Sequence, residues 1–217
     1  KHDLIEFWHL DPAKIVRSYN GLSLSPAGRD VWGKEHHLEP GSYILYLARL
    51  EHPGKNHLNL IKAYEKLPAE LKQKFQLVMP GASWGNSEVI FDYVSKSPDR
   101  ERILFPGFVG NEDLASVYQN AAMYVFPSFF EGFGLPLIEA MHHKVPCATA
   151  YTSSLGELGR GAALLFDPSE PGEITAAMQR ILTDGELRRQ LIAAGQKRAA
   201  EFNWDDHFRI IEERMKK

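Results

Sequence analysis

The sequence is poor in cysteine, in long apolar runs and in excess charge of either sign. Its 217 residues include a single cysteine, Cys147, which excludes an intrachain disulfide. No apolar run approaches the roughly 18 residues that a membrane-spanning helix needs, and the first residues do not resemble a secretory leader. The net charge of −3 gives no indication of a nucleic-acid or anionic-membrane partner. These absences indicate an ordinary globular protein, and 44% hydrophobic residues are enough for a full core.

Apolar runs alternate with helix-like segments along most of the chain. The run from Tyr43 to Ala48 is short and nearly continuous, as expected of a strand buried on both faces. Further strands are expected at 75–79, 102–105, 123–126, 145–150 and 163–166. Helices are expected at about 56–67, 87–96 and 111–121, from 135 onward, and at 171–183, 184–201 and 204–215, with Asn56 and Asn111 as caps. The alternation predicts an α/β fold, a doubly wound parallel sheet of about six strands. Cys147 falls in the fifth strand and is expected to be a buried core residue.

The stretch FEGFGLPLIEAM, from Phe130 to Met141, is unusual for the beginning of a helix. Pro136 suits the first helical turn, where its missing N–H costs nothing, so we expect the helix to start at Leu135 or Pro136. Gly132 and Gly134 allow the backbone to turn tightly and to approach a ligand. A helix N-terminus offers free N–H groups and partial positive charge, which favour phosphate. Since ligands of such sheets bind beyond the carboxyl ends of the strands, this helix start predicts a phosphate position.

Two carboxylates flank that helix start. Glu131 and Glu139 would repel phosphate but can accept hydrogen bonds from hydroxyl groups. A nucleotide sugar, with a diphosphate between two hydroxylated rings, would satisfy the whole arrangement. On spacing alone the better interpretation is that Glu139 is a solvated helix residue and Glu131 a loop charge. Arg49 and Lys55 flank the first strand–helix turn, where a diphosphate needs cations, and together with the helix start they make the ligand interpretation the better one.

Several segments together resemble one known family. PSFFEGFGLPLIEAM, from Pro127 to Met141, resembles the PSxxEGFGLPxLEAM motif of the glycosyl transferases group 1 (family four), which have the GT-B fold. The other similar segments are ARLEHPGKN from Ala48, GFV from Gly107, SSLGE from Ser153, AALLFDP from Ala162 and FNW from Phe202. The resemblance covers most of the chain and is to the C-terminal, donor-binding domain. It implies that residues 41–217 form a Rossmann-like nucleotide-sugar-binding domain. Residues 1–40 would then be a linker and the end of a preceding N-terminal domain, and their part from 18 onward is rich in Gly, Ser and Pro.

The resemblance implies roles for individual residues. Arg49 and Lys55 would contact the diphosphate and, with Glu131 on the donor sugar, form the catalytic set. Glu139 would bind the ribose. The expected donor-binding set is completed by Gly132, Phe133, Gly134, Leu135, Gly107, Val109 and Ser128. The family retains anomeric configuration and usually works without a metal, so no cofactor is expected and the two cations would neutralise the leaving diphosphate.

The resemblance also implies substrates and partners. The donor is expected to be GDP-mannose first, because ARL…KN and SSLGE look closest to mannosyl- and rhamnosyltransferases, and a UDP-hexose next. The acceptor, a glycan or lipid-linked glycan, would bind the N-terminal domain, so this part alone is expected to transfer poorly. Cytoplasmic residence is expected, with peripheral contact at the inner membrane face. The alternatives are a sugar-nucleotide-binding module without transfer activity, or a GT-B epimerase; a phosphorylase would need a pyridoxal phosphate lysine, and no motif suggests one.

Other positions depart from the family pattern or suggest other sites. Lys144 stands where a helix-ending glycine is common, and a positive φ there would cost roughly 1 kcal/mol of strain. Ala48, Gly156 and Gly161 also replace commoner residues. The pairs at 36–37 and 142–143 are adjacent histidines, which do not share a helix face, so no metal site is expected. Trp84 is expected to pack over its own loop rather than to stack on a ligand.

Overall fold

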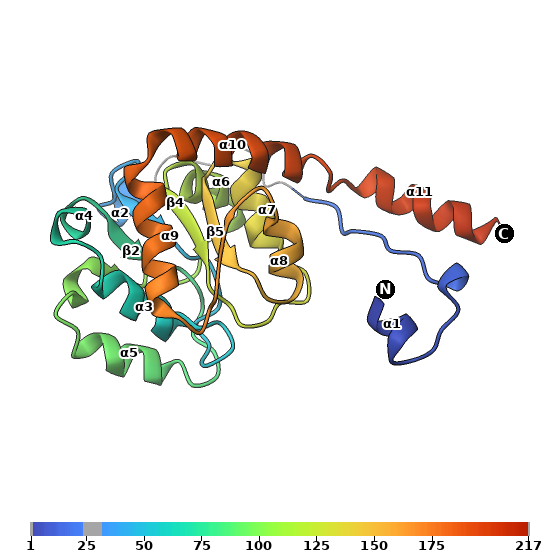
Figure 1. Ribbon diagram of the computed structural model, residues 1–217. Helices are drawn as coiled ribbons and strands as arrows, with labels where there is room; N and C mark the ends of the chain where they lie inside the picture. Colours follow the sequence, from blue (N-terminus) through green and yellow to red (C-terminus); the bar gives the residue numbers. More distant parts are fainter. Residues whose placement is uncertain (1, 24–31, 217) are drawn as a thin grey trace.

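The computed structural model describes residues 2–23 and 32–216 (Figure 1). Its centre is a six-stranded parallel sheet in the order β3-β2-β1-β4-β5-β6. The strands are β1 (Tyr43–Leu45), β2 (Gln76–Val78), β3 (Ile103–Leu104), β4 (Met123–Phe126), β5 (Cys147–Ala150) and β6 (Leu164–Phe166). All residues of β1, β4 and β5 are buried, because helices cover both faces of the sheet. The predicted doubly wound parallel sheet is confirmed.

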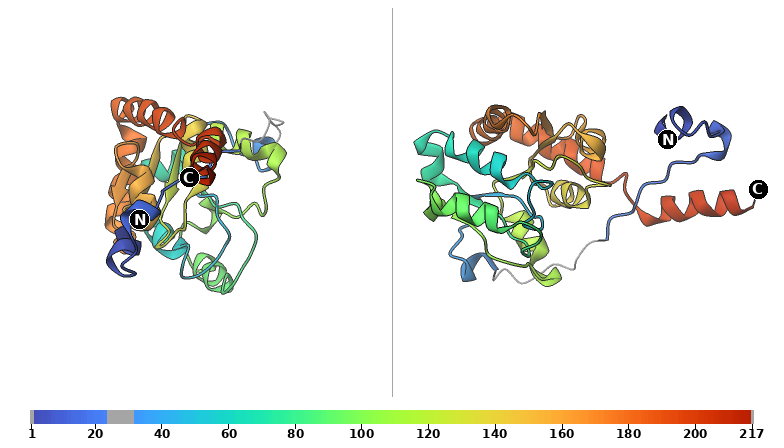
Figure 2. Two further views of the ribbon diagram at one scale, coloured as in Figure 1. Left: turned by 90° about the vertical axis from the view of Figure 1, so that its right-hand side faces the viewer. Right: turned by 90° about the horizontal axis from the view of Figure 1, so that it is seen from below.

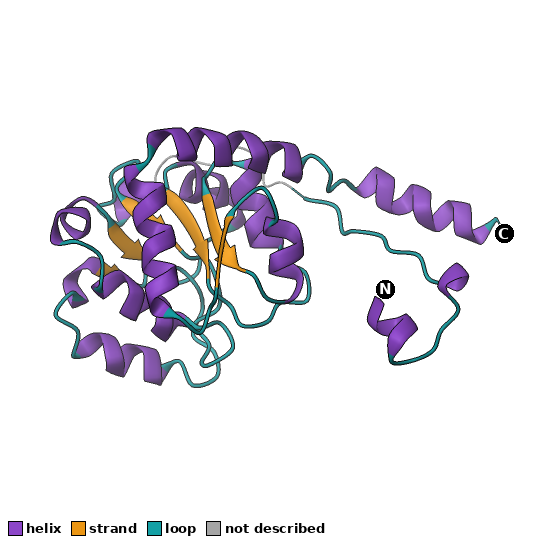
Figure 3. Ribbon diagram, viewed as in Figure 1, coloured by secondary structure: helices purple, strands orange, loops and turns teal. Residues whose placement is uncertain are grey.

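Helices enclose the sheet (Figure 3). The main ones are α3 (His57–Glu65), α4 (Ala69–Lys74), α5 (Glu88–Ser95), α6 (Asn111–Gln119), α7 (Leu135–His142), α8 (Ser153–Gly159), α9 (Pro171–Thr183), α10 (Gly185–Ala199) and α11 (Trp204–Met215). Shorter helical segments are α1 (His2–Glu6), η1 (Pro12–Lys14), α2 (Trp32–Glu35) and η2 (Arg100–Arg102). Helix α9 packs on α3, and α10 packs on α7, so the chain after the last strand covers parts of both helical layers. No helix among the described residues is long and apolar enough to cross a membrane.

The strand order sets the position of any ligand site. From β1 the chain builds outward through β2 and β3, then returns to place β4 on the opposite side of β1. The connections therefore leave the carboxyl ends of β1 and β4 in opposite directions, which opens a crevice between them. The segment after β1 contains Arg49 and Lys55, and the segment after β4 contains Glu131 and the start of α7.

Both ends of the chain extend from one side of this body (Figures 1 and 2). The N-terminal segment joins the body where Leu22 N–H donates to Phe202 O at 3.0 Å and where the Tyr19 ring meets the Phe202 ring at 5.1 Å. Helix α11 follows Phe202, and Trp204 and Phe208 on it are partly exposed. The two ends thus leave the body beside one another.

Some local predictions differ from the structure. Helices α4 and α8 were not expected. Residues 18–40 were expected to be loop or linker, but α2 forms there, and Trp32 is buried with its ring 6.5 Å from that of Tyr43. Residues 24–31 of that stretch lie outside the described residues. The boundary at residue 40 stays a prediction. Asn56 precedes α3 but makes no side-chain cap, and α6 is capped by Gly110, with Asn111 as its first residue. The predicted burial of Cys147 is confirmed, and burial raises the pKa of its thiol.

Candidate functional site

A cavity of about 290 Å³ lies between the carboxyl ends of β1 and β4. From the β1 side it is lined by Leu47, Ala48, Arg49 and Lys55, and from the β4 side by Phe126, Glu131, Phe133, Gly134, Leu135 and Pro136. The structure therefore brings both predicted cations, one predicted carboxylate and the start of α7 to one cavity. We refer to it below as the switch-point cavity.

Lys55 and Glu131 form an ion pair in this cavity. The Lys55 Nζ lies 2.6 Å from Glu131 Oε1, and the side chains are only 18% and 14% exposed. Beneath them the Tyr46 hydroxyl donates to Lys55 O at 2.8 Å and lies 3.0 Å from Ser128 Oγ. Tyr46 therefore joins the backbone at Lys55 to the loop that carries Glu131. The sequence analysis assigned Lys55 and Glu131 to different parts of a ligand and did not anticipate that they pair.

The loop that carries Glu131 is held from its other side by the start of α8. Ser153 Oγ accepts from Glu131 N–H at 3.1 Å, and Ser154 Oγ donates to Glu131 O at 2.9 Å. Thr152 Oγ1 donates to Phe129 O at 3.0 Å. Three successive hydroxyl side chains thus fix the backbone around Glu131. Sequence reasoning missed this role, although the run of Thr and Ser after β5 was its available signal.

The start of α7 is open toward the cavity. Gly134 has φ +105°, and a Cβ there would lie 2.8 Å from Leu155 Cδ2, so no other residue fits without strain. Helix α7 begins at Leu135 with Pro136 in its first turn, which confirms the predicted start. None of the hydrogen bonds recorded for the described residues uses the backbone N–H of Phe133, Gly134 or Leu135. These donors, and the positive end of the helix, are suited to an anion.

Arg49 lies at the rim of the cavity and is 54% exposed. Its Nη2 is 3.2 Å from Glu51 Oε2, and its guanidinium lies over the Trp84 ring at 5.1 Å. Trp84 is 60% exposed, and its backbone N–H donates to Leu50 O at 2.9 Å, which fixes the loop that carries the ring. Trp84 therefore packs on Arg49 rather than only over its own loop. A guanidinium placed in this way remains accessible to a ligand in the cavity.

Glu139 lies one turn into α7, on the same side as Leu135. Its Oε2 accepts a hydrogen bond of 2.8 Å from the hydroxyl of Tyr118, which is on α6. Burial raises the pKa of the Glu139 carboxyl above its usual value, and the hydrogen bond from Tyr118 opposes that rise. Glu139 is therefore not a freely solvated helix residue.

The other predicted donor-binding residues, Gly107, Val109, Ser128 and Gly132, are not among those that line the switch-point cavity. Val109 is buried in the core, while its neighbour Phe108 is 78% exposed. Gly107 O accepts from Gly81 N–H at 2.8 Å, which joins the segments after β3 and β2. Ser128 is fully buried and faces Tyr46, so its side chain supports the loop. Gly132 is exposed beside Glu131.

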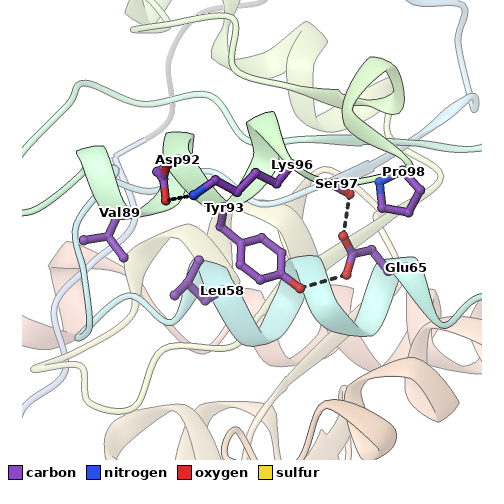
Figure 4. A pocket seen from close by; sticks show the side chains of 8 residues that line it. All are labelled: Leu58, Glu65, Val89, Asp92, Tyr93, Lys96, Ser97 and Pro98. Atoms are coloured by element: carbon purple, nitrogen blue, oxygen red, sulfur yellow. Dashed lines mark hydrogen bonds and ion pairs between the residues drawn. The ribbon is translucent and has the colours of Figure 1, made fainter.

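A second cavity, of about 390 Å³, lies between α3 and α5 (Figure 4). Its polar side chains are directed at one another. Glu65 accepts hydrogen bonds from Tyr93 and Ser97, and Lys96 pairs with Asp92 at 2.8 Å. Because its donors and acceptors are already satisfied, this groove offers less to a polar ligand than the switch-point cavity does. No group of three or more His, Cys, Asp or Glu side chains in residues 2–23 and 32–216 could hold a metal ion.

The chain is similar to proteins of one known family. The family model described as "Glycosyl transferases group 1" matches residues 30–198. The O-antigen chain mannosyltransferase B of Escherichia coli is 34% identical over 193 residues, which are 89% of this chain and 50% of that protein. The serotype-specific mannosyltransferase WbdA of Escherichia coli is 34% identical over 79% of this chain and 21% of its own length. Among solved structures, sucrose-phosphate synthase from Thermosynechococcus elongatus has a TM-score of 0.81 at 25% identity, over 99% of this chain and 55% of that one. The chain thus spans half or less of the length of the two Escherichia coli relatives.

Proposed function

Because the chain belongs to the glycosyl transferases group 1 family, we propose that it carries the nucleotide-sugar donor site of a retaining hexosyltransferase. One observation carries this proposal. The switch-point cavity gathers Arg49, Lys55 and Glu131 around the open N-terminus of α7. A diphosphate needs the cations and the amides, and a sugar needs the carboxylate.

In this proposal the diphosphate lies against the start of α7, between Arg49 and Lys55. Their positive charges and the helix N–H groups stabilise the negative charge that grows on the diphosphate as the glycosidic bond breaks. Lys55 is already oriented by its pair with Glu131 Oε1, and Glu131 Oε2 remains to accept hydrogen bonds from the sugar hydroxyls. Glu139 accepts hydrogen bonds from the ribose hydroxyls, and Val109 lies beside the nucleobase. The two cations perform the neutralisation, so the proposal includes no metal.

GDP-mannose is the donor that we propose first. The support is the mannosyltransferase names of the two Escherichia coli relatives, each 34% identical to this chain. A UDP-hexose is the second donor. The acceptor, a glycan or a lipid-linked glycan, would bind residues outside this chain, because the chain spans half or less of the length of these relatives. We propose cytoplasmic residence with peripheral contact at the inner membrane face, which fractionation of the full-length protein tests.

A thermal-shift panel with GDP, UDP, ADP and their mannose, glucose and N-acetylglucosamine conjugates tests the proposal. A nucleotide at about 100 times its Kd adds about 2.7 kcal/mol of stability. For a chain of this size that is a rise in melting temperature of about 5–10 °C. Stabilisation by one base, increased by one sugar, is the expected result. The absence of a shift with every nucleotide, in this chain and in the full-length protein, would refute the proposal.

A further inference from the structure

We propose that Tyr118 is a positioning residue of the donor site, whose hydroxyl orients the Glu139 carboxylate so that it can accept hydrogen bonds from the ribose hydroxyls. The inference rests on the proposed function, since it assigns a ribose to Glu139. It adds a residue that lies outside every motif segment quoted in the sequence analysis.

The first argument is geometric. Tyr118 is 1% exposed and reaches from α6 to α7, where its hydroxyl donates to Glu139 Oε2 at 2.8 Å. Its ring is stacked on His143 at 5.6 Å and 12°, and meets Tyr124 edge-on at 5.8 Å. The ring is thus packed on two sides, which holds its hydroxyl against Glu139. Glu139 has one oxygen held by this donor, and its Oε1 has no recorded partner among the described residues.

The second argument concerns the place of Glu139 in the site. Leu135, one turn before it on the same side of α7, lines the switch-point cavity. Tyr124, whose ring meets that of Tyr118, donates to Leu47 O at 3.4 Å, and Leu47 lines the cavity as well. Glu139 is not among the residues that line the cavity; it lies one turn beyond Leu135, where α7 faces Tyr118 of α6. That is where the ribose of a bound nucleoside diphosphate would extend.

The third argument concerns charge. Burial raises the pKa of Glu139 and thus favours the protonated acid, which is a poorer acceptor. The other titratable groups nearby are Tyr118, Tyr124, His143 and Cys147, and none of them is a cation that is fixed against the carboxylate. The hydrogen bond from the Tyr118 phenol is then the interaction that favours the ionised form of the Glu139 carboxyl. Its own pKa is raised well above normal by burial, so it stays a donor at all ordinary pH values.

The test compares binding of a ribonucleoside diphosphate with binding of its 2′,3′-dideoxy analogue by calorimetry. GDP and dideoxy-GDP are used first, and the UDP pair if GDP does not bind. The wild-type chain should prefer the ribonucleotide, and Tyr118→Phe should reduce that preference about threefold to tenfold, the worth of one hydrogen bond. The loss should come from weaker ribonucleotide binding, with the dideoxy analogue unchanged. In a Glu139→Gln background, Tyr118→Phe should have no further effect on the preference.

Tyr43→Phe is the matched control. Tyr43 is also 1% exposed, and its hydroxyl donates at 2.6 Å to the backbone O of Val117, the residue next to Tyr118. This variant should lose similar stability and keep the full ribose preference. The pH profile separates the two roles further. The preference should fade as pH falls through the pKa of Glu139, and in Tyr118→Phe it should fade at a higher pH than in the wild type.

Five results would overturn the inference. A ribose preference that is the same in Tyr118→Phe and in the wild type would show that the hydroxyl does not act on the ribose contact. Equal losses of preference in Tyr118→Phe and Tyr43→Phe would indicate a merely structural role. Nucleotide binding without any ribose preference would refute the role of Glu139 while the proposed function stands, and no nucleotide binding would refute both. If Tyr118→Phe does not fold, a crystal structure of the chain with the nucleoside diphosphate decides, and a Tyr118–Glu139 bond broken in that complex contradicts the inference.

Discussion

Replacement of Lys55 by methionine separates the structural role of the Lys55–Glu131 pair from its role in binding. Methionine keeps the aliphatic stem of the lysine and removes its charge. Glu131, whose side chain is only 14% exposed, then loses the cation 2.6 Å away and becomes an unpaired, mostly buried carboxylate. Both the stability of the fold and the affinity for a diphosphate should fall.

The magnitude follows from the burial of the pair. Removing one partner of a fully buried ion pair costs about 3–5 kcal/mol. Lys55 and Glu131 keep 18% and 14% of their side-chain surface in contact with solvent, so water screens the pair in part. We therefore expect a loss of about 2–3 kcal/mol in the free energy of unfolding. The double variant Lys55→Met/Glu131→Leu should regain most of it, because no charge is left without a partner.

The structure offers a matched control in the Lys72–Asp99 pair, which has the same 2.6 Å separation and the same exposures, 18% and 14%. Urea unfolding should show a similar loss for Lys72→Met and Lys55→Met. Calorimetry with a nucleoside diphosphate should show unchanged affinity for Lys72→Met, and an affinity at least about tenfold lower for both Lys55→Met and the double variant, since a charged hydrogen bond is worth about 1.5–3 kcal/mol. Equal affinities of Lys55→Met and Lys72→Met would refute the assignment of Lys55 to the diphosphate.

Three further predictions concern stability. Burial lowers the pKa of His57 from 6.5 to about 4, so His57 is neutral in the folded chain near neutral pH. The free energy of unfolding should therefore fall by on the order of 3 kcal/mol as pH falls from 6.5 toward 4, because the unfolded chain binds the proton more readily. Urea unfolding of His57→Leu should show a flatter pH profile over that window, and an equally steep profile would contradict this assignment. Burial raises the pKa of Glu139 above 4.5, so its ionised form destabilises the fold at higher pH, and Glu139→Gln should be more stable than the wild type at neutral pH, with the gain vanishing below pH 4.5. Lys144 has φ +63°, so Lys144→Gly should raise the melting temperature by about 1–4 °C, and an unchanged or lower value would mean that the strain is absent.

The fold could be predicted from the sequence because its strands are short continuous apolar runs between helical segments. Such runs are typical of a parallel sheet, and the six expected strands are the six observed. The start of α7 was also predictable, since Gly134 allows the positive φ before the helix and Pro136 suits the first helical turn. Helix α8 was missed because SSLGELG has two glycines and few apolar residues. Gly156 is needed there, as a Cβ would lie 1.9 Å from Tyr151 O, and this contact appears only in the fold.

The charged residues of the candidate site could be predicted from the sequence, but the contacts between them could not. The motif and the strand ends identified Arg49, Lys55 and Glu131, which lie in one cavity. The pairing of Lys55 with Glu131, 76 positions apart, depends on how β1 and β4 lie side by side. Asn56 suits a cap by residue type, but its amide instead donates to Pro127 O and Pro168 O at 2.9 and 2.7 Å. Tertiary hydrogen bonds here override the local preference.

The central claim is that the switch-point cavity binds a nucleotide sugar. The most direct test is to map backbone amide chemical shifts of the isotopically labelled chain while GDP-mannose, and then a UDP-hexose, is added. The account predicts that the largest changes fall on Arg49 and on Gly132 to Leu135, with smaller ones at Val109. Changes confined to the groove between α3 and α5, around Tyr93 and Lys96, or no changes with either donor, would contradict it.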